Sequence, residues 1–113
     1  MNCKLLISIC FFISLSSIAQ VDDVYSKHVR IADSLYKMKE YAKSAENYYL
    51  AFESIDRKAY PNDRYNAACS YALAGEVDSS FFHLFRLAES SVKYSNYNHI
   101  INDTDLQSLQ TDD

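Results

Sequence analysis

Glycine and proline are nearly absent from this sequence: one glycine and one proline occur in 113 residues, and there is no tryptophan. Proteins built of strands and tight turns need such residues at their hairpins, because glycine readily adopts the backbone conformations of those turns. Their scarcity argues against a strand-and-turn protein and favours an all-α one. The length allows one small domain, and the 49% of apolar residues suffices for a modest core.

The first nineteen residues have the composition of a secretory signal peptide. Lys4 gives a positive start, the apolar run LLISICFFISLSSI follows, and Ser17-Ile18-Ala19 offers the small residues that signal peptidase requires. We expect cleavage after residue 19, so that 20–113 is the mature, exported chain, periplasmic or secreted from a bacterial envelope. The alternative is an uncleaved membrane anchor, for which the apolar run is short. A lipidated cysteine is less favoured, because Cys10 lies in the middle of that run.

Cleavage changes the cysteine count and the charge. Cys3 and Cys10 leave with the signal, so Cys69 remains alone and no intramolecular disulfide can form. Small apolar residues surround it in NAACSYALA, which favours a packing role over a nucleophilic one. The formal net charge moves from -4 to near minus five with the loss of Lys4. This balance disfavours nucleic acid and anionic lipid as partners.

Apolar and aromatic residues recur at helical spacing in four segments, which form two pairs. The second pair follows the first at an offset of 36 residues, with identities such as Ala32 and Ala68, or Ser44 and Ser80. The sequence therefore predicts a repeated pair of helices. The predicted apolar faces are Tyr25, Val29, Ala32, Leu35 and Tyr36; Tyr41, Ala45, Tyr48, Phe52 and Ile55; Tyr65, Ala68, Tyr71 and Ala72; and Val77, Phe81, Leu84 and Ala88.

A period in the mid-thirties, filled by two antiparallel helices, resembles the tetratricopeptide repeat. The positions of that family's pattern are occupied by His28, Ile31, Ala32, Leu35, Ser44, Tyr48 and Ala51 in the first copy, and by Arg64, Ala67, Ala68, Tyr71, Ser80, Leu84 and Leu87 in the second. The resemblance covers Tyr25 to about Val92. The sequence departs from the family in having no tryptophan, serine for the small alanine in both copies, and no closing proline.

The resemblance implies a short α-solenoid of antiparallel helix pairs with a C-terminal capping helix. Repeat one spans about 25–58, repeat two about 61–92, and the capping segment about 102–111. All three belong to one domain over 20–113.

The single glycine marks a predicted turn inside the second helix pair. The chain must reverse after YALAG, and a residue just past a helix end commonly takes a left-handed conformation that suits glycine. Lys39 occupies the position that matches Gly75 in the first copy, so that turn is expected to be strained or shaped differently. The alanines before Gly75 allow close helix approach, and Phe81, Leu84 and Phe85 are expected to supply bulk from the partner helix.

The ends of the second pair also carry signals. Pro61 suits the first turn of a helix, and Asn62 or Asp63 is expected to cap it. The segment KYSNYNH reads as a polar, aromatic linker without helical periodicity.

A final short helix is predicted from NDTDLQSLQ. Asn102 or Asp103 is expected to cap it, with Leu106 and Leu109 on one side. The closing Asp-x-Asp-Leu-x-x-Leu pattern resembles the tails that follow some tetratricopeptide repeats. We expect it to cover the last hydrophobic face of the array.

Catalytic, cofactor and metal motifs are weak in this sequence. The histidines are His28, His83 and His99. No two of them have the spacing of a helical metal site, and the glycine and distant glutamate of a calcium loop are missing around Asp103 and Asp105. One glycine cannot build a phosphate loop, and no motif supplies an oxyanion hole for a pair of Cys69 and His83. We therefore expect no enzyme activity, no cofactor and no metal.

The remaining candidate site is the concave groove that the resemblance implies along the first helix of each pair. Its residues would be Val29, Arg30, Asp33, Tyr36, Lys37, Asn62, Tyr65, Asn66, Cys69 and Leu73. Tyrosines and an arginine fit a binding surface, although the tyrosines could equally be partly buried packing residues. Some family members grip a peptide's terminal carboxylate, but only Asn66 matches that clamp. Val29 and Asp33 stand where a lysine and an asparagine would be expected, so a carboxylate-ended peptide is disfavoured.

Two functions remain open. The first is an exported module that binds a protein or peptide of unknown identity in this groove. The second is a structural or oligomerising helical subunit of a larger envelope assembly, such as a homo-oligomer. Two repeats are fewer than the three usually needed to bury a continuous core, which keeps the second function open.

Export gives the first testable prediction. Protein recovered from expressing cells should begin at Gln20, because the small residues that end at Ala19 suit signal peptidase. Intact-mass measurement and N-terminal sequencing check this. A chain that keeps Met1 and stays with the membrane would instead support the uncleaved anchor.

Overall fold

The computed structural model of this protein describes residues 23–89 and 97–110, and the predicted signal peptide with its cleavage site lies outside them. The described chain is all-α, as predicted, and contains no strand in those ranges. None of its helices is long and apolar enough to cross a bilayer. The elements are an N-terminal helix over 23–37, α2 (Tyr41–Glu53), α3 (Pro61–Leu73), α4 (Val77–Glu89), α5 (Tyr97–Asn102), a 3₁₀ helix η1 (Thr104–Leu106) and α6 (Gln107–Gln110).

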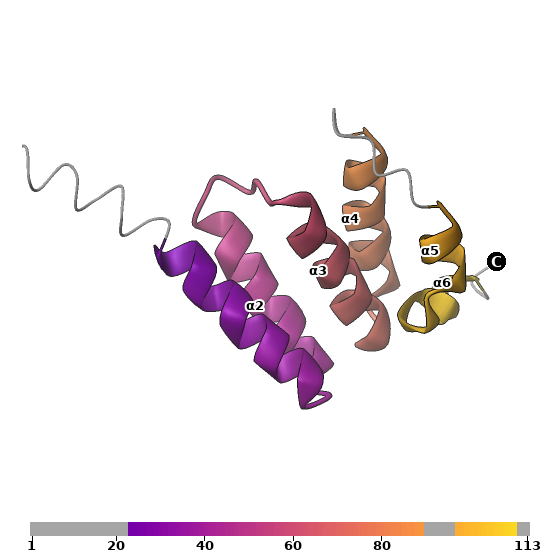
Figure 1. Cartoon of the computed structure of the whole chain (residues 1–113), viewed down its shortest axis with the longest axis horizontal. Helices are drawn as coiled ribbons and strands as arrows, with labels where there is room; N and C mark the ends of the chain where they lie inside the picture. The colour runs from indigo at the N-terminus through magenta and orange to yellow at the C-terminus, as the bar shows by residue number, and fades with distance from the viewer. Residues whose placement is uncertain (1–22, 90–96, 111–113) are drawn as a thin grey trace, which may run out of the picture.

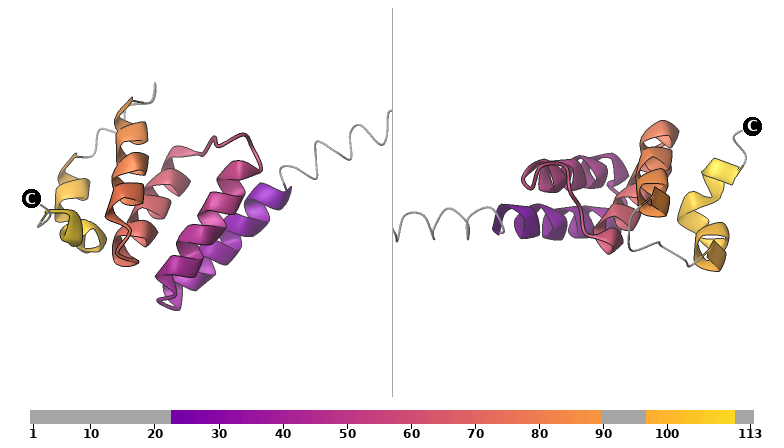
Figure 2. Two further views of the ribbon diagram at one scale, coloured as in Figure 1. Left: turned by 180° about the vertical axis from the view of Figure 1, so that it is seen from behind. Right: turned by 90° about the horizontal axis from the view of Figure 1, so that it is seen from above.

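The helices follow one another across the molecule in chain order (Figure 1). Seen from above, the N-terminal helix and α3 lie in one layer, and α2 and α4 lie in a second layer beside them (Figure 2). Helix α3 packs on both α2 and α4, and η1 and α6 pack on α3. The short C-terminal elements thus lie beyond the second helix pair and pack on α3.

The two helix pairs are held by the same internal hydrogen bond. Ser44 Oγ donates to the Ala32 carbonyl at 2.8 Å, and Ser80 Oγ donates to the Ala68 carbonyl at the same distance. Both serines are fully buried, so each hydroxyl satisfies its own hydrogen-bonding need within the interface. The 36-residue offset of the sequence is therefore repeated in the contacts that join the first and second helix of each pair. Serine at this position gives a polar link between the helices that alanine could not give.

The turns inside the two pairs also match. Gly75 has φ 81° and donates its N–H to the Ala72 carbonyl, which confirms the predicted left-handed turn. Lys39 has φ 62° and donates to the Tyr36 carbonyl in the same way. In both turns the next residue is a glutamate whose N–H donates a 2.9 Å hydrogen bond to a carbonyl of the preceding helix: Glu40 to Leu35, and Glu76 to Tyr71. The first turn keeps the shape of the second, but with a side chain in a conformation that favours glycine.

The core has two parts, one for each helix pair. The first is made of Tyr25, Ala32, Tyr48, Ala51, Phe52 and Ala67; the second is made of Tyr65, Cys69, Ala72, Leu87, Leu106 and Leu109. Leu106 and Leu109 are both buried in the second part, which confirms that the C-terminal segment, residues 103–110, covers the apolar face of the second pair. Because α3 contributes residues to both parts, it joins the two parts of the core.

The predicted apolar face of α4 is wrong at its C-terminal end. Ala88 of that face is exposed, and Phe85, which was expected to supply bulk to the helix interface, is 64% exposed. The buried residues of this helix are Ser80, His83 and Leu87. Val77, Phe81 and Leu84 are partly buried against the second core, as predicted. The error arises because the buried face includes polar Ser80 and His83, which a count of apolar residues ignores.

Two expected helix ends also differ from the structure. Helix α3 begins at Pro61 with Tyr60 at the N-cap position, so neither Asn62 nor Asp63 caps it. Asp63 instead accepts a 2.7 Å hydrogen bond from the Tyr25 hydroxyl. The final residues of KYSNYNH, expected in a linker, belong to α5, while residues 93–96 of that segment lie outside the described chain.

The cap predicted at Asp103 is present. Its carboxylate accepts a hydrogen bond from the N–H of Asp105 at 2.9 Å, at the start of η1. The alternative cap, Asn102, is instead the last residue of α5.

Opposite substitutions at the two matching turns should have opposite effects on stability. Gly75→Val should lower the free energy of unfolding by more than about 1 kcal/mol, because a branched residue resists positive φ. An added Cβ at Gly75 would meet no other atom within 4 Å, so this cost is one of backbone conformation. Lys39→Gly should raise stability by up to about 1 kcal/mol by removing the same strain.

Urea unfolding of both variants beside the wild type measures these effects. Lys58→Gly is a suitable control for added chain flexibility, because Lys58 is exposed in a loop. Loss of stability in both the Lys39 and Gly75 variants would contradict the equivalence of the two turns.

Candidate functional site

A cavity of about 530 Å³ lies along the side of the molecule formed by the N-terminal helix, α3 and the C-terminal segment. We call it the inner cavity. Six of the ten residues predicted for the groove line it: Asp33, Tyr36, Lys37, Tyr65, Asn66 and Cys69. The structure therefore brings residues of the first helices of both pairs to one hollow.

The other four predicted residues do not line this cavity. Val29 is partly buried against the first part of the core, and Leu73 is partly buried at the end of α3. Arg30 and Asn62 are exposed, but outside the cavity. The hollow lies where the middle of α3 meets the C-terminal segment. The four other residues lie at helix positions too far from this junction to line it.

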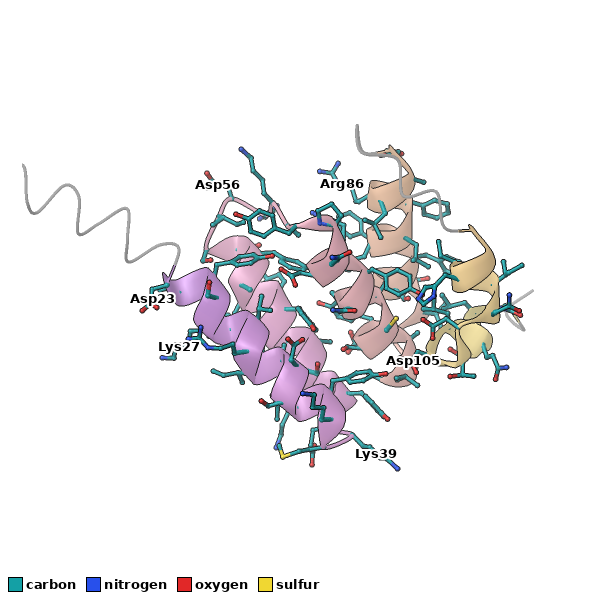
Figure 3. All side chains as sticks on the ribbon, in the orientation of Figure 1. Asp23, Lys27, Lys39, Asp56, Arg86 and Asp105 are labelled. Atoms are coloured by element: carbon teal, nitrogen blue, oxygen red, sulfur yellow. The ribbon has the colours of Figure 1, made fainter. Side chains whose placement is uncertain are left out.

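Three phenol hydroxyls around the inner cavity donate hydrogen bonds to three carboxylates. The pairs are Tyr36 with Asp105, Tyr48 with Asp33, and Tyr65 with Asp103 at 2.6 Å. Two of these carboxylates belong to the C-terminal segment, and Figure 3 shows Asp105 where that segment meets α3. The segment is thus one wall of the cavity, held to the N-terminal helix and α3 by charge-assisted hydrogen bonds.

These hydrogen bonds keep the phenols protonated. The pKa of Tyr36 is raised, first by its hydrogen bond to Asp105 and then by burial. Burial raises the pKa of Tyr48 most, and its hydrogen bond to Asp33 adds to the effect. Both side chains therefore remain donors, and the negative charge of the cavity rests on the carboxylates.

The cavity lining carries three carboxylates and one ammonium group. The carboxylates are Asp33, Asp103 and Asp105, and the ammonium is that of Lys37, which is exposed on the N-terminal helix. Because their charges act together in a partly enclosed space, the cavity has a negative potential that favours cationic ligands.

Cys69 lies in the same wall as a buried thiol. It is 4% exposed, and its Sγ is 3.9 Å from the Asp103 carboxylate. Burial raises the pKa of this thiol, and the charges of Asp103 and Asp105 raise it further. These conditions hold Cys69 as a neutral thiol that packs against the core.

In the described part of the chain, one group of side chains could hold a metal ion. Potential ligand atoms of Cys69, Asp103 and Asp105 lie within 4.8 Å of one another. All three side chains already make hydrogen bonds within the chain. Asp105 accepts from Tyr36, and Asp103 accepts from Tyr65 and from the Cys69 thiol. The cluster is therefore explained as part of the link between α3 and the C-terminal segment.

The three histidines occupy separate environments. The Nδ1 of His28 lies 3.1 Å from the Oδ1 of Asn47. His83 is buried beside Arg64, on the side of α3 that faces away from the inner cavity. His99 lines the inner cavity, with its Nε2 3.6 Å from Asp103.

Sequence reasoning missed five residues of the cavity lining: Tyr48, His99, Asp103, Thr104 and Asp105. His99 was expected in a linker, and the other three C-terminal residues were expected in a segment that caps a short helix and covers an apolar face. The i,i+4 spacing of His99 and Asp103 was the one local signal of their proximity.

Comparison with known protein families, with curated proteins and with solved structures found no match for this chain. The comparisons therefore assign no family to this chain. The cavity must be interpreted from its own side chains.

The burial of Cys69 predicts slow reaction with thiol reagents. The folded protein should react with Ellman's reagent far more slowly than the urea-unfolded protein, because only an exposed thiolate attacks readily. Absorbance at neutral pH measures both rates, and a Cys69→Ala variant gives the background. Equal rates in the folded and unfolded protein would contradict the buried thiol.

Proposed function

We propose that this chain is an exported, tetratricopeptide-like interaction module whose inner cavity binds a segment of a partner protein. The observation that carries the proposal is the cavity lining, in which three carboxylates are held in place by tyrosines from different elements. Fixed side chains around an open hollow lose little entropy on binding, which suits recognition. The proposal assigns no catalysis and no cofactor to the site.

The solenoid interpretation has support from the repeated contacts. The hydroxyl link between helices and the left-handed turn recur in both pairs, 36 residues apart. Tetratricopeptide arrays present the first helix of each pair on their concave side, and the N-terminal helix and α3 both contribute to the inner cavity.

The chemistry of the partner follows from the cavity charge. A lysine or arginine side chain would be attracted by Asp33, Asp103 and Asp105 and could donate hydrogen bonds to their free lone pairs. An acidic segment would be repelled by the same groups. We therefore infer a partner segment with at least one basic side chain.

Photo-crosslinking tests whether the cavity binds a partner. A benzoylphenylalanine at Asn66, which is exposed and lines the cavity, should capture the partner in the exporting cell. The same residue at Lys27, exposed on the N-terminal helix and outside the cavity, is the control (Figure 3). Capture at neither position, or equally at both, would refute binding in this cavity.

Charge reversal at Lys37 then tests whether the partner segment carries a positive charge. With the captured segment as titrant, Lys37→Glu should tighten binding by about threefold to tenfold, because it removes the one ammonium of the lining. Lys27→Glu makes the same change of net charge outside the cavity and should have a much smaller effect. Calorimetry at 50 and 300 mM salt measures both, and weaker binding by the Lys37 variant would exclude a basic partner segment.

A structural role is the second candidate, and the surface of α4 favours it. Phe82 and Phe85 are both largely exposed on this helix, and exposed aromatic side chains are common at contacts between subunits. Sedimentation equilibrium separates the two functions. A stable monomer at micromolar concentration supports the interaction module, and an obligate dimer that Phe85→Ser dissociates supports the oligomerising subunit.

A further inference from the structure

A second hollow lies between the two helices of the other layer. It has a volume of about 620 Å³, with walls from α2 and α4 and a floor from α3. We call it the outer trough. It shares no lining residue with the inner cavity, so it is a separate feature of the molecule.

The floor of the outer trough contains a buried arginine that has only neutral partners. Arg64 is 8% exposed, with Nη1 3.1 Å from His83 Nδ1 and Nη2 donating to the Arg57 carbonyl at 3.3 Å. Its guanidinium also lies over the Phe52 ring, 5.5 Å from the centroid. Within 23–89 and 97–110, no carboxylate lies within 4.0 Å of it. A buried cation without a counter-ion is costly, so this arrangement needs an explanation.

The surroundings of Arg64 disfavour its positive charge further. Burial lowers its pKa, and the positive charge of Arg86 lowers it further. His83 remains neutral at neutral pH, because burial and then Arg64 lower its pKa to about 4. Its Nδ1 can therefore accept from the guanidinium, but the imidazole supplies no negative charge.

The other charges of the trough limit what it can bind. Arg57 pairs with Glu53 at 3.0 Å, and Asp78 lies at the opposite wall. Arg86 is exposed on α4, at the end of the molecule away from Lys39 (Figure 3), and makes no ion pair within the described ranges. A ligand with a single carboxylate could therefore pair with two guanidinium groups, those of Arg64 and Arg86, that have no carboxylate partner among the described residues. A polyanion such as nucleic acid would also meet Glu53 and Asp78, which oppose it.

Exposed aromatic rings flank these charges. Tyr49 on α2 is 52% exposed and Phe82 on α4 is 57% exposed, and both line the trough. Rings exposed on two facing helices offer apolar contact to a side chain that enters between them.

We propose that the outer trough binds a protein segment in which a glutamate or aspartate stands beside an aromatic or large aliphatic side chain. The carboxylate pairs with Arg64 and Arg86, and the apolar side chain lies between Tyr49 and Phe82. A protein segment is complementary to the trough because adjacent side chains of one chain can pair with the two arginines and lie against the two exposed rings at once.

The test uses the peptide acetyl-Gly-Phe-Glu-Phe-Gly-amide and its twin with glutamine in place of glutamate. Titration of the purified, isotope-labelled protein, followed by NMR, should show shifts of the arginine side-chain N–H signals and a dissociation constant at least about fivefold lower for the glutamate peptide. Higher salt should reduce this difference. No binding of the glutamate peptide at 10 mM, or equal binding of the twin, would overturn the proposal.

Variants locate the binding site. Arg86→Gln should weaken binding of the glutamate peptide by about fivefold, whereas Lys27→Gln, which removes an exposed charge from the N-terminal helix, should leave it unchanged. Arg86 is exposed, so its variant is expected to fold, and a thermal melt verifies this. An unchanged affinity in folded Arg86→Gln would place the peptide elsewhere.

Two further measurements distinguish other occupants of the trough. If 3-phenylpropionate, a free carboxylate with one ring, binds as tightly as the peptide, the site is one for small molecules and the protein-segment proposal fails. If the wild type dimerises and Arg86→Gln is monomeric, a second copy of this chain is the occupant and provides the carboxylate. The peptide and 3-phenylpropionate outcomes do not depend on the inner cavity, so they leave its proposed binding function to its own tests, whereas a dimer would support the oligomerising subunit.

Discussion

The packing of α3 is the constraint on which the other features depend. This helix contacts α2 on one side, α4 on another and η1 and α6 on a third, and seven of its thirteen residues are buried. Close approach on several sides requires small residues, and Ala67, Ala68 and Ser70 have no exposed surface. Other side chains of this helix line the two hollows on either side of it. Tyr65 and Cys69 face the inner cavity, and Arg64 and Tyr71 face the outer trough.

The C-terminal segment couples the end of the array to the inner cavity. Leu106 and Leu109 fill the second part of the core, while Asp103 and Asp105 extend from the same short stretch to the tyrosines of α3 and the N-terminal helix. Asp103 also caps η1, so one carboxylate serves both the local fold and the cavity wall. A change at Asp103 would therefore alter the shape of the segment and the charge of the cavity together. For this reason Lys37, which projects without such a structural role, is the better probe of binding.

Sequence reasoning succeeded where the signal was local and failed where it was not. The helical spacing, the left-handed turn at Gly75 and the paired leucines each depend on residues a few positions apart. The hydrogen bond between Tyr36 and Asp105 joins residues 69 positions apart, and nothing local distinguishes those side chains from ordinary surface tyrosines and aspartates. Arg64 was assigned only to a position of the repeat pattern, because its lack of a counter-ion becomes visible only when the surrounding helices are in place.

The two hollows differ in charge, and this difference has a consequence for function. The inner cavity gathers three carboxylates, whereas the outer trough holds Arg64 and Arg86 without a carboxylate partner among the described residues, on a chain whose formal net charge is -4. Opposite potentials on opposite sides of α3 favour chemically different ligands, and neither ligand would displace the other. The two proposals together describe a short helical array that could hold a basic segment on one face and an acidic segment on the other. Both sites share α3, whose packing against α2, α4, η1 and α6 fixes the direction in which its side chains enter each hollow, so the order of this one helix is a condition for both proposals.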